Sequence, residues 1–153
     1  MATRVKPRSE ELYEADFYAW ASEQASLLRA GRFQDLDVER LVEEVDDLGG
    51  ALYRSVRSRV RTIMEHLLKL QYAPAEAPRA GWRDTVLTQR RDLIDDLTPS
   101  LRRRLGAEIE QHYARARDTA SRSLRYHGED AAADALPDRC PYTFEQIIGD
   151  WLP

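Results

Sequence analysis

Hydrophobic residues of this 153-residue chain recur at the spacing of amphipathic helices, and no stretch alternates in the manner of a strand. The clearest run covers 41–70, where an apolar side chain returns every three or four residues. Asp37 precedes the run as a helix N-cap. A diglycine at 49–50 interrupts it, but the stripes before and after stay in phase at about 100° per residue. We therefore predict one long helix over about 38–72, with two helices broken at the diglycine as the alternative.

Further helices are predicted on both sides of this one from the same periodicity and from capping residues. They cover 13–30, 82–97 and 98–127, with a short turn at 130–135 and a last short helix at 143–149. Residues 1–8 are expected to form a loose arm, and two prolines mark 73–81 as a hinge. The sequence thus predicts an all-α fold: a single domain over 1–153, built as an elongated bundle of about five helices around the long one.

The length of the central helix has a consequence for assembly. One amphipathic helix of this length exposes more apolar stripe than four shorter helices readily cover, and uncovered apolar surface favours association. We therefore expect a homodimer.

Composition narrows the class of protein. No uncharged stretch approaches the roughly 20 apolar residues of a membrane span, and no apolar segment follows Met1 as in a secretory signal. Cys140 is the single cysteine, so an internal disulfide and a Cys-rich zinc site are excluded. The net charge of −4 disfavours general nucleic-acid binding. We expect a soluble cytoplasmic protein, without a membrane or nucleic-acid partner.

A group of carboxylates near the start of the long helix is the candidate for metal chemistry. All-α nucleotide pyrophosphohydrolases hold Mg²⁺ with an ExxE motif followed by ExxD. Here Glu11 and Glu14 have the first spacing, and Glu43 with Asp46, or Glu44 with Asp47, has the second. A solvated acidic face is the simpler interpretation for most of these side chains. Glu44 lies at the flank of the apolar stripe, and Arg40, one turn earlier, is its expected partner.

Two further faces of the long helix carry polar residues. One holds His66 and the rare lysine Lys69, which are candidates for a groove or for acid–base chemistry, or simply for a seam between helices. His66 is 22 residues from Glu44, about 33 Å along an unbroken helix, so the two cannot share a site within one helix. The other face is basic and formed by Arg54, Arg57 and Arg61.

The motifs together resemble a bacterial family of helical proteins, domain-of-unknown-function family 29. The matching stretches are 13–20, 27–33, 36–49, 66–72, Trp82 with 89–90, and 140–143. The resemblance implies an all-helical fold in a small bacterial protein and implies no activity. It makes a set of motif residues candidates for a shared site, or equally for determinants of the fold: Glu44, His66, Lys69, Trp82, Gln89, Arg90 and Cys140. Among them, Trp82, Gln89 and Arg90 are candidates for a groove.

Three functions follow as hypotheses. The first is a non-enzymatic protein-interaction module whose groove or dimer face binds another bacterial protein, with no cofactor. The second is a metal-dependent nucleotide phosphohydrolase that uses Mg²⁺ on Glu43, Glu44 and Asp47. The third is a nucleic-acid-associated regulator that uses the basic face. Whether the protein is an enzyme is left open.

Overall fold

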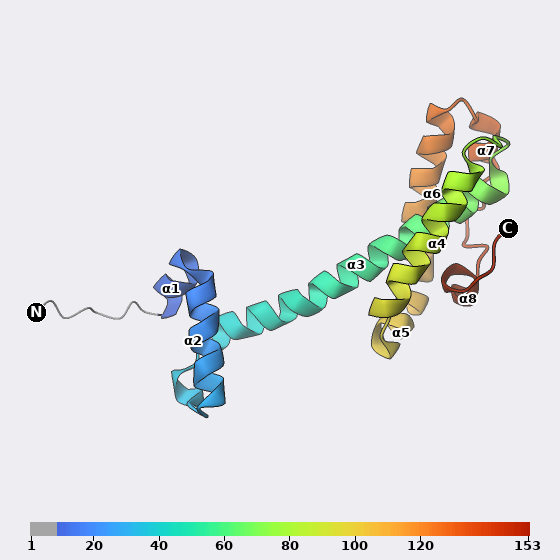
Figure 1. The fold of residues 1–153 in the computed structure, drawn as a ribbon. Coiled ribbons are helices and arrows are strands. Elements are labelled where there is room, and N and C mark those ends of the chain that lie inside the picture. The colour runs from blue at the N-terminus through green and yellow to red at the C-terminus, as the bar shows by residue number, and fades with distance from the viewer. Residues whose placement is uncertain (1–8) are drawn as a thin grey trace, which may run out of the picture. The chain divides into compact units, whose positions relative to one another are not determined.

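The structure is a computed structural model that describes residues 9–153, and within that range it contains helices and no strand. The all-helical class is therefore confirmed, while the arm expected over 1–8 lies outside the described residues. Its elements, labelled in Figure 1, are α1 (Ser9–Ala15), α2 (Phe17–Arg29), a short 3₁₀ turn (Phe33–Asp35), α3 (Val38–Tyr72), α4 (Arg79–Asp96), α5 (Pro99–Ala107), α6 (Ile109–Tyr126), α7 (Asp130–Asp134) and α8 (Phe144–Ile148).

The long helix α3 has the predicted bounds and runs through the diglycine without a break. The alternative of two helices separated at 49–50 is wrong, because the in-phase stripes belong to one helix. The same diglycine nevertheless marks a division of the chain into two compact units, one ending at Gly49 and the other spanning Gly50–Pro153. The expectation of a single domain over 1–153 stays a prediction.

The amino-terminal unit is organised around the side chain of Asp37. This carboxylate accepts hydrogen bonds from Ser9 Oγ at 2.8 Å and from Trp20 Nε1 at 3.3 Å. It also accepts from the Arg40 backbone N–H at 3.4 Å, as expected of an N-cap. Gln24, which is buried, accepts the Asp37 N–H at 2.8 Å. One acidic residue thus ties α1 and α2 to the first turn of α3.

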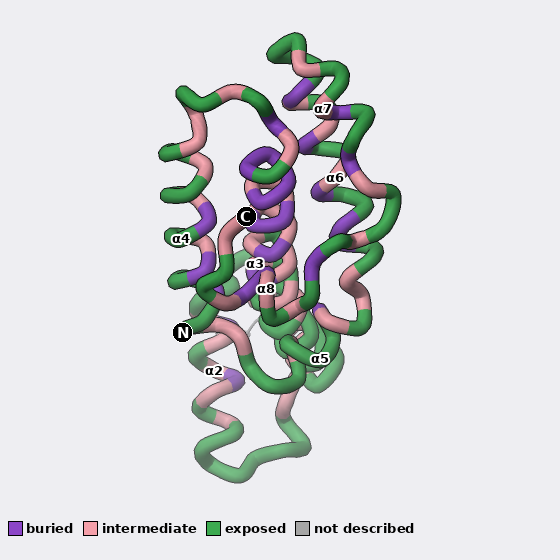
Figure 2. Tube along the Cα trace, turned by 90° about the vertical axis from the view of Figure 1, so that its right-hand side faces the viewer, coloured by how far each residue is buried: buried purple, intermediate pink, exposed green. Residues whose placement is uncertain are grey.

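The carboxy-terminal unit holds most of the apolar core. Figure 2 shows the buried turns of α3 with α4, α6 and α8 around them. Fully buried side chains from three of these helices include Ile63, Leu67, Leu93 and Ile147. All the buried residues of α3 lie between Val56 and Leu70, so the core of this unit forms around the second half of the helix.

Helix boundaries differ from the prediction at three places. The single helix expected over 13–30 is wrong, because α1 ends at Ala15 and α2 begins at Phe17. Asp16 between them is the N-cap of α2, and its carboxylate accepts the Ala19 N–H at 3.0 Å.

The single helix expected over 98–127 is wrong, because α5 ends at Ala107 and α6 begins at Ile109. At the break, the Glu108 carboxylate accepts hydrogen bonds from Tyr53 Oη and from Arg104 Nε.

At the third place, α4 begins three residues earlier than expected, so that the hinge predicted over 73–81 is shorter. Pro78 precedes its first turn, a position where the missing N–H of proline costs nothing.

The short elements near the end of the chain follow the prediction. The turn at 130–135 is α7, and α8 begins at a capping box in which Thr143 and Gln146 bond each other's backbone N–H groups.

None of the described helices combines the length and the apolar character that crossing a membrane requires.

Candidate functional site

The candidate carboxylate Glu44 is bound by an aromatic side chain. Tyr13 Oη donates a hydrogen bond to Glu44 Oε1 at 2.5 Å. The pKa of Tyr13 rises to about 12, first because of this bond and then because of burial. The expected pairing of Glu44 with Arg40 is wrong. Arg40 instead pairs with Glu43 at 2.9 Å, and its guanidinium carbon lies 4.8 Å from the centre of the Tyr13 ring. Tyr13 therefore contacts both side chains, with its hydroxyl on Glu44 and its ring facing Arg40.

The three candidate metal ligands, Glu43, Glu44 and Asp47, do not share a common site. Glu43 is engaged by Arg40, Glu44 by Tyr13, and Asp47 is exposed. Within residues 9–153, no group of three or more His, Cys, Asp and Glu side chains is placed to hold a metal ion. His66, the candidate base, belongs to the other unit.

An exposed apolar stripe occupies the first three turns of α3. Its members keep more than half of their surface in water: Val38 58%, Val42 55%, Val45 65% and Leu48 72%. At about 100° per residue they fall within about 120° of the helix circumference. We call these four residues the α3 stripe, and they are all in the amino-terminal unit.

Carboxylates border the α3 stripe on both edges. Glu39 and Asp46 follow one edge on the helical wheel, and Glu44 follows the other. Arg40, the one basic residue of this segment, is already paired with Glu43. The surface is therefore apolar along its middle and negative along its rims.

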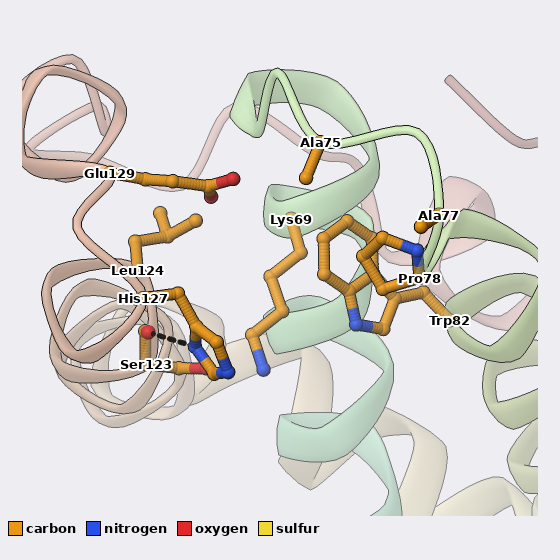
Figure 3. Close-up of a pocket in the computed structure, with 9 residues that line it drawn as sticks. All are labelled: Lys69, Ala75, Ala77, Pro78, Trp82, Ser123, Leu124, His127 and Glu129. Atoms are coloured by element: carbon orange, nitrogen blue, oxygen red, sulfur yellow. Dashed lines mark hydrogen bonds between the residues drawn. The ribbon is translucent and has the colours of Figure 1, made fainter.

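A pocket in the carboxy-terminal unit brings together two of the predicted groove residues, Lys69 and Trp82. Its volume is about 750 Å³. Figure 3 shows side chains from α3, α4 and the end of α6 around it. The full lining is Lys69, Ala75, Ala77, Pro78, Trp82, Ser123, Leu124, His127 and Glu129. Lys69 is 7% exposed, and its Nζ donates a hydrogen bond to Glu65 Oε1 at 2.6 Å.

The other predicted groove residues lie elsewhere. His66 uses its Nδ1–H to bond the Thr62 carbonyl at 2.9 Å and does not line the pocket. Gln89 is half-buried on α4 and is also outside the lining. Arg90 is buried and its pKa is lowered because burial removes water from the guanidinium. Its nitrogens donate hydrogen bonds to three backbone carbonyl groups in α8 and the segment after it. These bonds attach that segment to α4.

Cys140 is half-buried beside α6. Its backbone N–H donates to Glu110 Oε2 at 3.1 Å, and its thiol donates to the Tyr142 carbonyl at 3.4 Å. Burial raises the pKa of the thiol, which disfavours the nucleophilic thiolate. These contacts are those of a structural residue.

Sequence reasoning missed a polar cluster between α3, α5 and α6. Glu108 joins Tyr53, Arg104 and the buried His112, whose Nε2 is 3.3 Å from the carboxylate. Hydrogen bonds from Tyr53 and Arg104 lower the pKa of Glu108. Burial, and then the charge of Arg61, lower the pKa of His112. The i, i+4 spacing of 104, 108 and 112 was the available signal.

The cluster also changes the interpretation of the basic face. Arg61 Nη2 lies 3.3 Å from His112 Nδ1, and the guanidinium carbon of Arg57 lies 5.3 Å from the centre of the Tyr53 ring. Arg54, by contrast, is exposed. Two of the three arginines therefore serve contacts inside the unit.

A family model described as "Domain of unknown function DUF29" matches residues 12–152, which is nearly the whole chain. No curated protein and no solved structure matches the chain. The resemblance noted from the sequence motifs is confirmed.

Proposed function

Because the chain belongs to the DUF29 family, whose description names no activity, we propose a function from its own surface: a non-enzymatic protein-interaction module that docks a partner on the α3 stripe. The observation that carries this proposal is the exposure of four apolar side chains on one face of a helix. Covering side chains that keep more than half of their area in water returns on the order of 1 kcal/mol each. Such a stripe is suited to an amphipathic helix, which inserts its own apolar face.

The charges beside the stripe select the kind of partner. Carboxylates on both rims favour a helix that carries Lys or Arg on either side of its apolar face. A second copy of this chain fits less well. Two copies that face each other across their α3 stripes bring acidic rims against acidic rims in either relative direction, because Glu39 and Asp46 border one edge of the stripe and Glu44 the other. We therefore commit to a basic amphipathic helix of another protein, and the homodimer becomes an outcome of the test.

The test uses a synthetic amphipathic helix with leucines on one face and lysines along both edges. A second peptide has glutamates in place of the lysines. Fluorescence anisotropy is expected to show binding of the lysine peptide alone, with an affinity that falls as salt screens the rims. The Val42→Ser/Val45→Ser variant should bind the lysine peptide about tenfold more weakly. Its matched control is Ile94→Ser, which changes an exposed apolar side chain on α4.

Three outcomes overturn the proposal. In the first, both peptides bind equally well. In the second, the double variant binds as tightly as the unmodified protein. In the third, the chain forms a dimer that Val45→Ser dissociates and the lysine peptide leaves intact. Sedimentation of the protein alone over a range of concentrations identifies this last case.

The two other functions stay predictions. A metal-dependent nucleotide phosphohydrolase requires Glu43, Glu44 and Asp47 to converge on Mg²⁺. A nucleic-acid-associated regulator requires Arg57 and Arg61 to leave their contacts with Tyr53 and His112. The α3 stripe requires no such rearrangement.

A further inference from the structure

The pocket that holds Lys69 and Trp82 has the size of a small-molecule site. Its volume of about 750 Å³ lies within the range of roughly 300–1,000 Å³ that such sites occupy. Its residues come from α3, from the loop after it, from α4 and from the end of α6, all in the carboxy-terminal unit. This site is separate from the α3 stripe and does not depend on the function proposed for it.

One wall of the pocket is apolar and offers a flat surface. The indole of Trp82 and the ring of Pro78 form it together with the methyl groups of Ala75 and Ala77, and Figure 3 shows Leu124 on the opposite side. A wall of aromatic and small side chains that faces an aliphatic side chain across a pocket accommodates a flat apolar group.

The floor of the pocket holds a buried ammonium group with spare hydrogen-bonding capacity. Lys69 Nζ carries three N–H groups, and Glu65 accepts one of them. The Lys69 side chain is 9% exposed, so water reaches it poorly. Buried donors without acceptors are costly, and an acceptor supplied by a ligand removes that cost.

The remaining polar groups restrict the charge of a ligand. His127 donates its Nδ1–H to the Ser123 carbonyl at 2.8 Å, which leaves Nε2 as an acceptor when the ring is neutral. Glu129 adds a carboxylate to the lining, and Glu65 already faces Lys69. One ammonium beside two carboxylates disfavours a dianion such as a phosphate monoester. A cationic headgroup supplies no acceptor for the remaining N–H groups of Lys69.

We propose that this pocket binds a small carboxylic acid with a flat apolar body. The ligand's carboxylate accepts hydrogen bonds from the ammonium of Lys69, and its body lies against the indole of Trp82. A monoanionic carboxylate supplies the acceptors that the two spare N–H groups need, bonds an ammonium more strongly than a neutral carbonyl does, and adds less negative charge beside Glu65 and Glu129 than a dianion.

The experiment uses benzoate as the probe, with benzamide, benzylamine and phenyl phosphate as its neutral, cationic and dianionic analogues. Binding is followed through the indole N–H resonance of Trp82, identified by its loss in Trp82→Leu. Benzoate is expected to shift this resonance saturably. Each analogue should bind at least about tenfold more weakly, which corresponds to about 1.4 kcal/mol.

Two variants, Lys69→Met and Glu65→Gln, distinguish a Lys69 that binds the ligand from a Lys69 that only forms a structural ion pair with Glu65. Lys69→Met should lower benzoate affinity at least about tenfold, whereas Arg83→Met, which removes an exposed cation from α4, should leave it unchanged. Glu65→Gln removes the competing carboxylate and keeps the ammonium, so benzoate should bind as tightly or more tightly. A structural ion pair predicts that Glu65→Gln weakens binding as much as Lys69→Met does.

The proposal is overturned if benzamide or benzylamine binds as tightly as benzoate, or if benzoate binding survives Lys69→Met. It is also overturned if a folded Glu65→Gln variant no longer binds. If Lys69→Met does not fold, the ranking of the four probes on the unmodified protein and the Glu65→Gln result decide the matter.

Discussion

Removal of Arg90 is expected to detach the end of the chain from α4. This buried arginine donates from Nε to the Ile147 carbonyl at 2.9 Å. Its Nη2 donates to the carbonyls of Gln146 at 2.7 Å and Trp151 at 2.8 Å. The acceptors are at the end of α8 and in the segment after it. An Arg90→Met variant keeps the aliphatic volume of the side chain and loses all three bonds at once.

The size of the effect follows from two opposing contributions. A hydrogen bond from a charged group contributes about 1.5–3 kcal/mol, so three bonds represent several kcal/mol. Against this, the guanidinium is buried, its pKa is lowered by that burial, and its Nη1 has no hydrogen-bond partner. Methionine avoids that desolvation cost, and water can solvate the freed carbonyls near the chain end. We expect a net loss of about 3 kcal/mol in the free energy of unfolding.

The neighbouring Arg91 is exposed and provides a matched control. Urea unfolding of Arg91→Met should stay within about 0.5 kcal/mol of the unmodified protein. Amide hydrogen exchange should then show that Arg90→Met loses protection first at Ile147 and Ile148. Equal stability of the two variants, or a loss of protection that begins in α6, would refute the assignment of Arg90 as the anchor of this segment.

Local sequence signals were sufficient for most helices. The phase of the apolar stripe across 49–50 predicted α3 as one helix, because phase is preserved only if the chain keeps its helical twist. Asp37 and Thr143 predicted two helix starts, because an N-cap bonds N–H groups two or three residues ahead. In each case both partners are close together in the sequence.

Contacts between distant residues escaped the same reasoning. Tyr13 reaches Glu44 across 31 residues, and Tyr53 reaches Glu108 across 55. Helical periodicity predicts which face of a helix a side chain lies on. It does not predict which distant residue will contact that side chain. The first contact displaced the expected Arg40 partner, and the second accompanies the break between α5 and α6.

The candidate pocket was predictable in part. Lys69 was a candidate because lysine is rare in this chain, and Trp82 was a candidate because it belongs to the motifs shared with the DUF29 family. His127 and Glu129 complete the lining from beyond the end of α6, and neither carries a local pattern that points to Lys69. A pocket formed by three helices depends on their packing, which a linear pattern does not contain.

Two ionisable contacts give opposite pH dependences. The folded state holds the Tyr13 proton to a pKa of about 12 and the unfolded chain loses it near 10, so stability should fall between these values, and Tyr13→Phe or Glu44→Gln should flatten the fall. The phenolate absorbance that Tyr13→Phe removes should therefore titrate near 12, and titration near 10 would contradict the bond to Glu44. His112 is the reverse case, because burial and Arg61 lower its pKa below the ordinary 6.5. The unfolded chain binds that proton first, so stability should fall as pH drops below about 6.5. Urea midpoints measured down to pH 5 should show a shallower fall in His112→Gln than in the exposed control His127→Gln, since burial of His112 disfavours its protonated form in the folded state. Parallel slopes in these two variants would mean that His112 takes up its proton in the folded protein as readily as in the unfolded chain.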